Sequence, residues 1–200
     1  MKSQTLIIDE NHKYWLDGNQ ILGVNEIINS VFPFEGSGLA AERTANFGLA
    51  VHKAISLKIK GILNPATVDL VLKPYIEQFW KYFDDQRIIY RGDHVHNEEF
   101  KTEIMLYHKK YNYAGTIDLI DNEIVWDVKT GQKHPKHRLQ IAAYRKLWNH
   151  NFPKDKKKIG KIIYLNESDK PPEIVSEKAS DFNVFLSMLE IKKFKESEKL

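Results

Sequence analysis

The chain has 200 residues, of which 42% are hydrophobic and 28% are charged, and it contains no cysteine. A chain of this length can bury one well-formed core, so we expect a single domain over residues 1–200. The lack of cysteine excludes disulfides, thiolate zinc sites and cysteine nucleophiles, and it leaves carboxylates and imidazoles as candidate metal ligands. The formal net charge of +3 is too small to indicate nucleic-acid binding on its own.

The N-terminus, MKSQTLIIDENHKYW, turns polar after three successive apolar residues, so it lacks the apolar core of a signal peptide. No other stretch approaches the 18 or so apolar residues that a membrane span needs. We therefore expect a cytoplasmic protein that does not enter a membrane. No G-x-x-x-x-G-K-[ST] phosphate loop occurs, which excludes an ATP-driven motor of that type.

The N-terminal part, over residues 1–90, is predicted to contain a small β-meander and three helices. Short apolar bursts between turn residues indicate the meander over Gln4–Ile21. Asn25 is a candidate cap for a short helix over residues 26–31. Apolar residues at helical spacing then predict two long amphipathic helices, over residues 39–60 and 66–86.

The catalytic core is expected over residues 95–166, where the hydrophobic period changes. Runs of β-branched and aromatic residues predict three antiparallel strands over residues 100–107, 113–120 and 123–129. A helix over residues 136–149, strands over 159–165 and 173–175, and a terminal helix over 180–198 capped by Ser180 follow. This order predicts an α/β fold with a central mixed β-sheet flanked by helices.

Two carboxylates and a lysine stand out on the middle strands. Asp127 and Lys129 are two residues apart on one strand, so their side chains share a face. The tight turn at residues 121–122 places Asp118 of the preceding strand opposite Asp127. Such a pair repels unless a cation neutralises it, and oxygen ligands favour Mg²⁺ or Mn²⁺. The sequence therefore predicts a divalent metal site.

These residues also carry a resemblance to a known family. The spacing G-x-x-D at 115–118, D-V-K-T-G at 127–131, Q-x-x-x-Y at 140–144 and G-x-x-V-H at 48–52 resembles the PD-(D/E)XK nuclease superfamily, and within it RecB-like and phage exonuclease members. The likeness runs from Tyr14 to Leu165 and implies a restriction-endonuclease-like core. Two departures are Ile117, where the type pattern has proline, and the missing cysteine cluster of some RecB relatives, which implies no iron–sulfur cluster.

The resemblance implies roles for five residues. Asp118, Asp127 and the backbone carbonyl of Val128 would bind Mg²⁺, and Lys129 would orient or activate the attacking water. His52, on the inward stripe of its helix, would complete the metal shell through a neutral imidazole nitrogen.

Three further positions are assigned to the same site. Gln140 and Tyr144 lie at i and i+4 on one helical face, where they can hydrogen-bond the active-site carboxylates or a phosphate. Related nucleases hold a metal-associated glutamate on the strand before the G-x-x-D run, and Glu103 and Glu99 are both candidates for it. We favour Glu103, because its distance from Gly115 suits one hairpin.

Basic residues gather directly after the predicted catalytic strand, where a phosphate backbone would need them. We expect Lys133, Lys136 and Arg138 to contact DNA phosphates, whereas the lysines between 154 and 161 are typical of a solvated face. The absence of a base-reading motif favours recognition of the DNA backbone.

The leading hypothesis is a Mg²⁺-dependent DNA nuclease, specifically a phage-type recombination or repair exonuclease. The alternatives are an endonuclease that acts on flapped or branched DNA, and a non-catalytic DNA-binding or phage-assembly module that keeps the nuclease fold. The exonuclease hypothesis leaves room for a single-strand annealing or recombination protein as partner. Strand preference, polarity and oligomeric state stay open.

Overall fold

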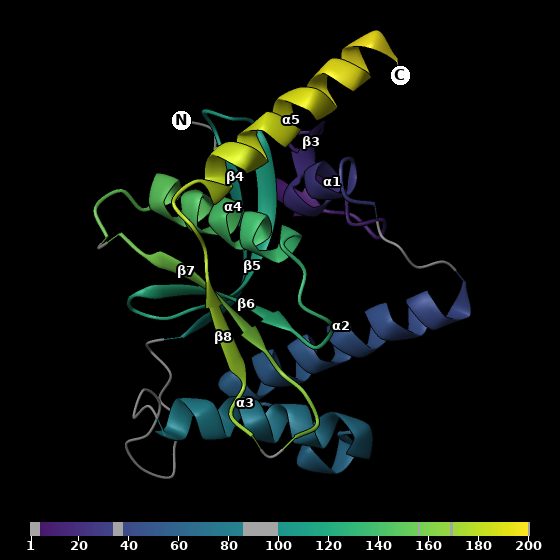
Figure 1. Cartoon of the computed structure of the whole chain (residues 1–200), viewed down its shortest axis with the longest axis vertical. Helices are drawn as coiled ribbons and strands as arrows, with labels where there is room; N and C mark the ends of the chain where they lie inside the picture. Colours follow the sequence, from purple (N-terminus) through teal and green to yellow (C-terminus); the bar gives the residue numbers. More distant parts are fainter. Residues whose placement is uncertain (1–4, 34–37, 86–99, 156, 169, 200) are drawn as a thin grey trace.

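The computed structural model describes residues 5–33, 38–85, 100–155, 157–168 and 170–199. In this part of the chain an eight-stranded sheet separates two groups of helices, as Figure 1 shows. The sheet is mixed, because β3–β5 and β6–β7 are parallel pairs among antiparallel ones. The predicted α/β class, with a central mixed sheet, flanking helices and an N-terminal meander, is confirmed.

The strands lie close to their predicted positions. The meander consists of β1 (Leu6–Ile8), β2 (Tyr14–Leu16) and β3 (Asn19–Gly23). The remaining strands are β4 (Lys101–His108), β5 (Tyr113–Ile120), β6 (Ile124–Lys129), β7 (Ile159–Tyr164) and β8 (Glu173–Ser176). Their order in the sheet is β1-β2-β3-β5-β6-β7-β8, and β4 pairs with β5 off this path.

The pairing of β5 leaves an opening in the sheet. Its first residues pair with the end of β3, at Tyr113 and Ala114. Its last residues, Leu119 and Ile120, pair with β6. Residues 115–117 therefore pair with β4 on one side, but in the described part of the chain no strand pairs with residues 115–118 on the other. Backbone groups at such an opening need other partners.

Helices cover both faces of the sheet. They are α1 (Val24–Asn29), α2 (Leu39–Ile59), α3 (Lys73–Asp85), α4 (Lys136–Asn151) and α5 (Asp181–Glu198). Figure 1 shows α4 and α5 on one side of the central strands and α2 and α3 on the other. Among the described residues no helix has the length and the apolar composition needed to cross a bilayer.

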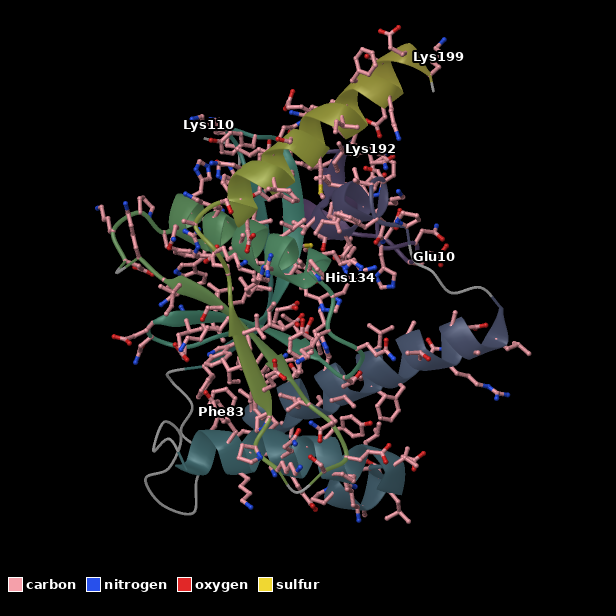
Figure 2. The ribbon with its side chains drawn as sticks, in the orientation of Figure 1. Glu10, Phe83, Lys110, His134, Lys192 and Lys199 are labelled. Carbon is pink, nitrogen blue, oxygen red and sulfur yellow. The ribbon has the colours of Figure 1, made fainter. Side chains whose placement is uncertain are left out.

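Two hydrophobic clusters hold these helices to the sheet. Alternation along β6 sends Val125 into the cluster of α1, α4 and α5, and Trp126 into the cluster of α2 and α3. Phe83 of α3, labelled in Figure 2, packs against Trp126 with the ring centroids 5.4 Å apart. Each fully buried side chain of this kind contributes about 1.5–3 kcal/mol. Because β6 is packed against helices on both faces, it holds Asp127 and Lys129 in defined positions at its end.

Three local predictions were wrong. Asn25 does not cap the first helix, which begins at Val24, so Asn25 lies inside it. The helix predicted over residues 66–86 begins only at Lys73, because Asn64 and Asp69 each cap a single 3₁₀ turn before it. Ser180 stands at the start of α5, but its side chain makes no capping hydrogen bond.

Candidate active site

Asp118 lies where β5 and β6 separate. The register of the two strands, Leu119 with Trp126, places Asp118 next in line to face Asp127. The strands have already diverged there, and the side chain of Asp118 bridges them, because its Oδ2 accepts a hydrogen bond of 3.0 Å from the backbone N–H of Val128. The opening in the sheet thus brings both predicted carboxylates to one place.

Asp127 is fully buried and is held by Lys129. The Lys129 ammonium donates to Asp127 Oδ1 at 2.9 Å. It also lies 2.8 Å from Oδ2, but in an orientation that makes no hydrogen bond, so Oδ2 is a buried oxygen without a hydrogen-bond partner. A buried charged oxygen in this state is costly. The arrangement leaves a strong acceptor available beside Lys129.

The two carboxylates have opposite pKa shifts. Burial raises the pKa of Asp127 to about 6, and repulsion from Asp118 adds to this against the attraction of Lys129. Burial acts in the same direction on Asp118, but attraction to His52 and Lys129 outweighs it and lowers the pKa of that carboxyl. Such a pair titrates as a unit. Perturbed carboxylates in one cleft are typical of functional sites.

His52 of α2 closes the site from the side opposite α4. Its Nε2 lies 2.8 Å from the carbonyl oxygen of Val128, which accepts the hydrogen bond, and its Nδ1 lies 3.5 Å from Asp118 Oδ2. Burial lowers the pKa of His52, but the Asp118 charge outweighs this and raises it. The resemblance assigns both the imidazole and the Val128 carbonyl to a metal, but here they are hydrogen-bonded to each other.

The donor set fits Mg²⁺ in part. In the described residues no three His, Asp or Glu side chains are gathered into a ready-made metal-binding group. The unpartnered Oδ2 of Asp127 and the carboxylate of Asp118 are nevertheless the hard oxygen ligands that Mg²⁺ prefers. The Val128 carbonyl would join them once its bond to His52 opens.

Glu103 lies directly across β4–β5 from Asp118, because the pairs Thr102–Leu119 and Ile104–Ile117 flank it. Its φ of 54° is unusual for a residue inside a strand. Burial and then the Asp118 charge raise its pKa. Strain of this kind concentrates at functional sites. The alternative candidate, Glu99, lies outside the described residues.

Gln140 and Tyr144 contact each other rather than the carboxylates. The Gln140 amide nitrogen donates to the Tyr144 hydroxyl oxygen at 3.1 Å and to Oδ1 of Asn25 at 2.9 Å. Sequence reasoning missed Asn25 as a site residue, because a good cap former beside a helix start explained it locally. The three side chains tie α1 to α4 at the edge of the opening.

Gly115 allows α4 to approach β5 at this point. A Cβ added there would lie 2.8 Å from a ring carbon of Tyr144 and 3.0 Å from a methyl carbon of Leu147. We expect Gly115→Ala to destabilise the fold by about 1–3 kcal/mol, because both helical side chains are buried in the core and would have to shift. Urea unfolding measures this. Gly131→Ala is the matched control, since nothing lies within 4 Å of its added Cβ, and equal losses in both variants would contradict the argument.

A cleft of about 930 Å³ opens onto the site. The end of β6, α1, α2 and the segment leading into α4 line it, and its lining includes Asn25, Gly48, His52, Val128, Lys129, Thr130, Lys133, His134, Lys136, His137 and Gln140. A concave surface with convergent polar groups is the usual form of a binding site.

Two of the three predicted phosphate contacts are ion-paired within the protein. Lys133 lies 2.7 Å from an oxygen of Glu173, and Arg138 lies 3.2 Å from Asp181. Asp181 is buried at the start of α5, so the Arg138 pair holds α4 to α5. Lys133 and Lys136 line the cleft, whereas Arg138 is absent from its lining.

Comparison with known proteins supports the fold. No family model and no curated protein matches the sequence. Among solved structures, a protein named "Putative exonuclease" from Eubacterium rectale overlays with a TM-score of 0.51 at 13% identity, over 84% of this chain and 70% of that one. LHK-Exo, in complex with dAMP, gives a TM-score of 0.38 at 8% identity, over 90% and 93% of the two chains. The first likeness shows that this chain has a fold similar to that of a protein named as an exonuclease.

Proposed function

We propose that this protein is a Mg²⁺-dependent DNA nuclease that hydrolyses phosphodiester bonds. The observation that carries the proposal is the buried Asp127, whose Oδ2 has no hydrogen-bond partner while Lys129 lies against the same carboxylate. Asp118 stands at the adjoining strand opening, and the neighbouring His52, Val128 and Lys129 line the cleft. Buried like charges destabilise a fold, so a metal-dependent reaction gives a reason for keeping them.

Each side chain has a role in this proposal. Asp118 and Asp127 would hold the cation, which supplies charge stabilisation to the phosphate and makes a water easier to deprotonate. Lys129 places an ammonium where negative charge develops on the phosphate, and it orients the attacking water. His52 holds the Val128 carbonyl through a hydrogen bond, and the carbonyl would join the cation once that hydrogen bond opens. Gln140 and Asn25, whose amides are hydrogen-bonded to each other, form part of the cleft wall beside the bound strand.

Exonuclease action is the form of this proposal that we favour, and the fold similarity to a protein named as an exonuclease supports it. An endonuclease specific for flaps or branches would use the same groups, because the surrounding loops decide which DNA enters. A non-catalytic DNA-binding module is disfavoured by the complete set of Asp118, Asp127 and Lys129.

The test is incubation of the protein with end-labelled linear DNA and with closed circular DNA, each in Mg²⁺ and in EDTA. We expect cleavage only in Mg²⁺ and only of the linear DNA. Nicking of the circle would favour the endonuclease. Binding without cleavage of either DNA in Mg²⁺ and Mn²⁺ would instead favour the non-catalytic module.

The proposed cation also predicts an effect on stability. At about ten times its dissociation constant a bound ion adds roughly 1.4 kcal/mol, which raises the Tm of a chain of this size by about 3–6 °C. Differential scanning fluorimetry with Mn²⁺, against a matched concentration of K⁺, measures the shift. We expect Asp118→Asn to lose most of it, and an unchanged wild-type Tm at millimolar Mn²⁺ would contradict a site at these carboxylates.

A further inference from the structure

Two imidazoles line the cleft near the start of α4, and neither belongs to the metal site described above. His134 and His137 both face the same cleft as Lys129. Figure 2 labels His134 at the N-terminal end of α4. In the sequence the two histidines lie among the basic residues Lys133, Lys136 and Arg138. Their hydrogen bonds indicate a different chemistry.

The Nδ1 atom of each ring is held by the protein. His134 Nδ1 accepts a hydrogen bond of 3.0 Å from the backbone N–H of Lys136. His137 Nδ1 lies 2.9 Å from the hydroxyl oxygen of Tyr164. Burial raises the pKa of Tyr164, so its hydroxyl keeps a hydrogen that it can donate to His137 Nδ1. A neutral imidazole that accepts at Nδ1 carries its hydrogen on Nε2.

The surroundings keep this pair uncharged. Burial, and then repulsion from Lys129, Lys136 and His134, lower the pKa of His137 to about 3. Burial and the nearby Asp127 charge raise the pKa of Tyr164 to about 12. Tyr164 is the register partner of Lys129 on the adjacent parallel strand, so the pair is built onto the strand end that carries Lys129. Among the described residues no acceptor bonds to Nε2 of His137.

We propose that His137, fixed by Tyr164, is a substrate-contact residue that donates its Nε2–H to a phosphate oxygen of the DNA strand bound next to Lys129. This inference rests on the proposed function and extends it. A phosphate oxygen is the acceptor that every nucleotide offers irrespective of sequence. Because the donor is neutral, the contact positions the strand without releasing a counterion, unlike a lysine contact.

The test uses two amide substitutions that separate the ring nitrogens. His137→Gln keeps a donor near the position of Nε2, whereas His137→Asn keeps one only near Nδ1, on the Tyr164 side. Dissociation constants for a labelled single-stranded oligonucleotide are measured in Ca²⁺, so that the result does not depend on cleavage. We expect His137→Asn and His137→Ala to bind about tenfold more weakly, and His137→Gln to bind within about threefold of the wild type.

Two further readouts separate contact from structural support. Tyr164→Phe removes the group that fixes the tautomer, so it should weaken binding by less than His137→Ala. A salt titration should give His137→Ala the wild-type slope, whereas Lys136→Ala should lower the slope by at most about 0.7. If His137→Gln and His137→Asn weaken DNA binding equally, His137 does not donate its Nε2–H to the phosphate. A shallower salt slope in His137→Ala would contradict the proposal as well. If the wild type binds but does not cleave, the proposed function fails while these binding differences still decide the role of His137.

Discussion

Replacing Asp127 by Asn is expected to lower the rate of DNA cleavage by roughly 10³-fold or more while leaving the protein folded and able to bind DNA. The amide has nearly the shape of the carboxylate, and its oxygen can still accept from Lys129, which now donates to Oδ1 at 2.9 Å. What is lost is the charge and the second oxygen, which has no hydrogen-bond partner in the fold. Single-turnover cleavage of a labelled duplex in Mg²⁺ measures the effect.

The same variant has a second, independent consequence for stability. Because burial raises the pKa of Asp127 to about 6, the folded state binds a proton more tightly than the unfolded state. In EDTA, the wild type should therefore lose stability as the pH rises from about 4 through 6, and the Asn variant should lose less. Asp155→Asn, at an exposed loop position, is the control.

For the rate prediction, cleavage by Asp127→Asn within tenfold of the wild-type rate would show that Asp127 is not part of the catalytic site.

The strands and the carboxylate cluster could be predicted because their signals are local. Alternation along β6 and the tight turn after β5 fix the register of Leu119 with Trp126, and Asp118 and Asp127, next in that register, lie close enough for their charges to interact. The sequence did not indicate that the strands diverge at this point. The opening lies between the part of β5 that pairs with β6 and its first two residues, which pair with β3, a contact between residues about 90 positions apart in the chain.

The errors come from local signals that tertiary contacts override. Asn25 is a favourable cap by composition, but its partner Gln140 lies 115 residues away, and only the fold brings them together. Asn64 and Asp69 are favourable helix caps, so the sequence held a signal for short turns before α3. The apolar residues at helical spacing from Val68 onward nevertheless predicted one long helix.

The basic region after β6 shows the same limit. Its composition predicts phosphate contacts, yet Lys133 pairs with Glu173 and Arg138 with Asp181, 40 and 43 residues further on. Charge counts along a sequence do not tell which cations are already neutralised. The neutral imidazole of His137 could not be recognised either, because its state depends on its burial and on its contact with Tyr164.

Replacing Lys129 by Ala should be as damaging as the loss of Asp127, for a different reason. The ammonium lies 2.9 Å and 2.8 Å from the two oxygens of Asp127, and it is the positive side chain that offsets this fully buried charge. Without it, the pKa of Asp127 should rise further above 6, so that the carboxyl is protonated at neutral pH and holds a cation poorly. We expect a fall of roughly 10³-fold or more in cleavage, together with a shift of the remaining activity to higher pH.

Lys129→Arg distinguishes a water-orienting ammonium from a general positive charge. The guanidinium restores the charge, so the Asp127 carboxylate should ionise again and the pH profile should return toward that of the wild type. Its planar fork is larger and cannot take the place of a compact ammonium that is largely buried between β6 and the cleft, so the cleavage rate should stay low. Lys195→Arg and Lys195→Ala, on an exposed turn of α5, are the matched controls. If Lys129→Arg cleaves DNA within tenfold of the wild type, the positive charge alone is sufficient and Lys129 serves as a phosphate clamp.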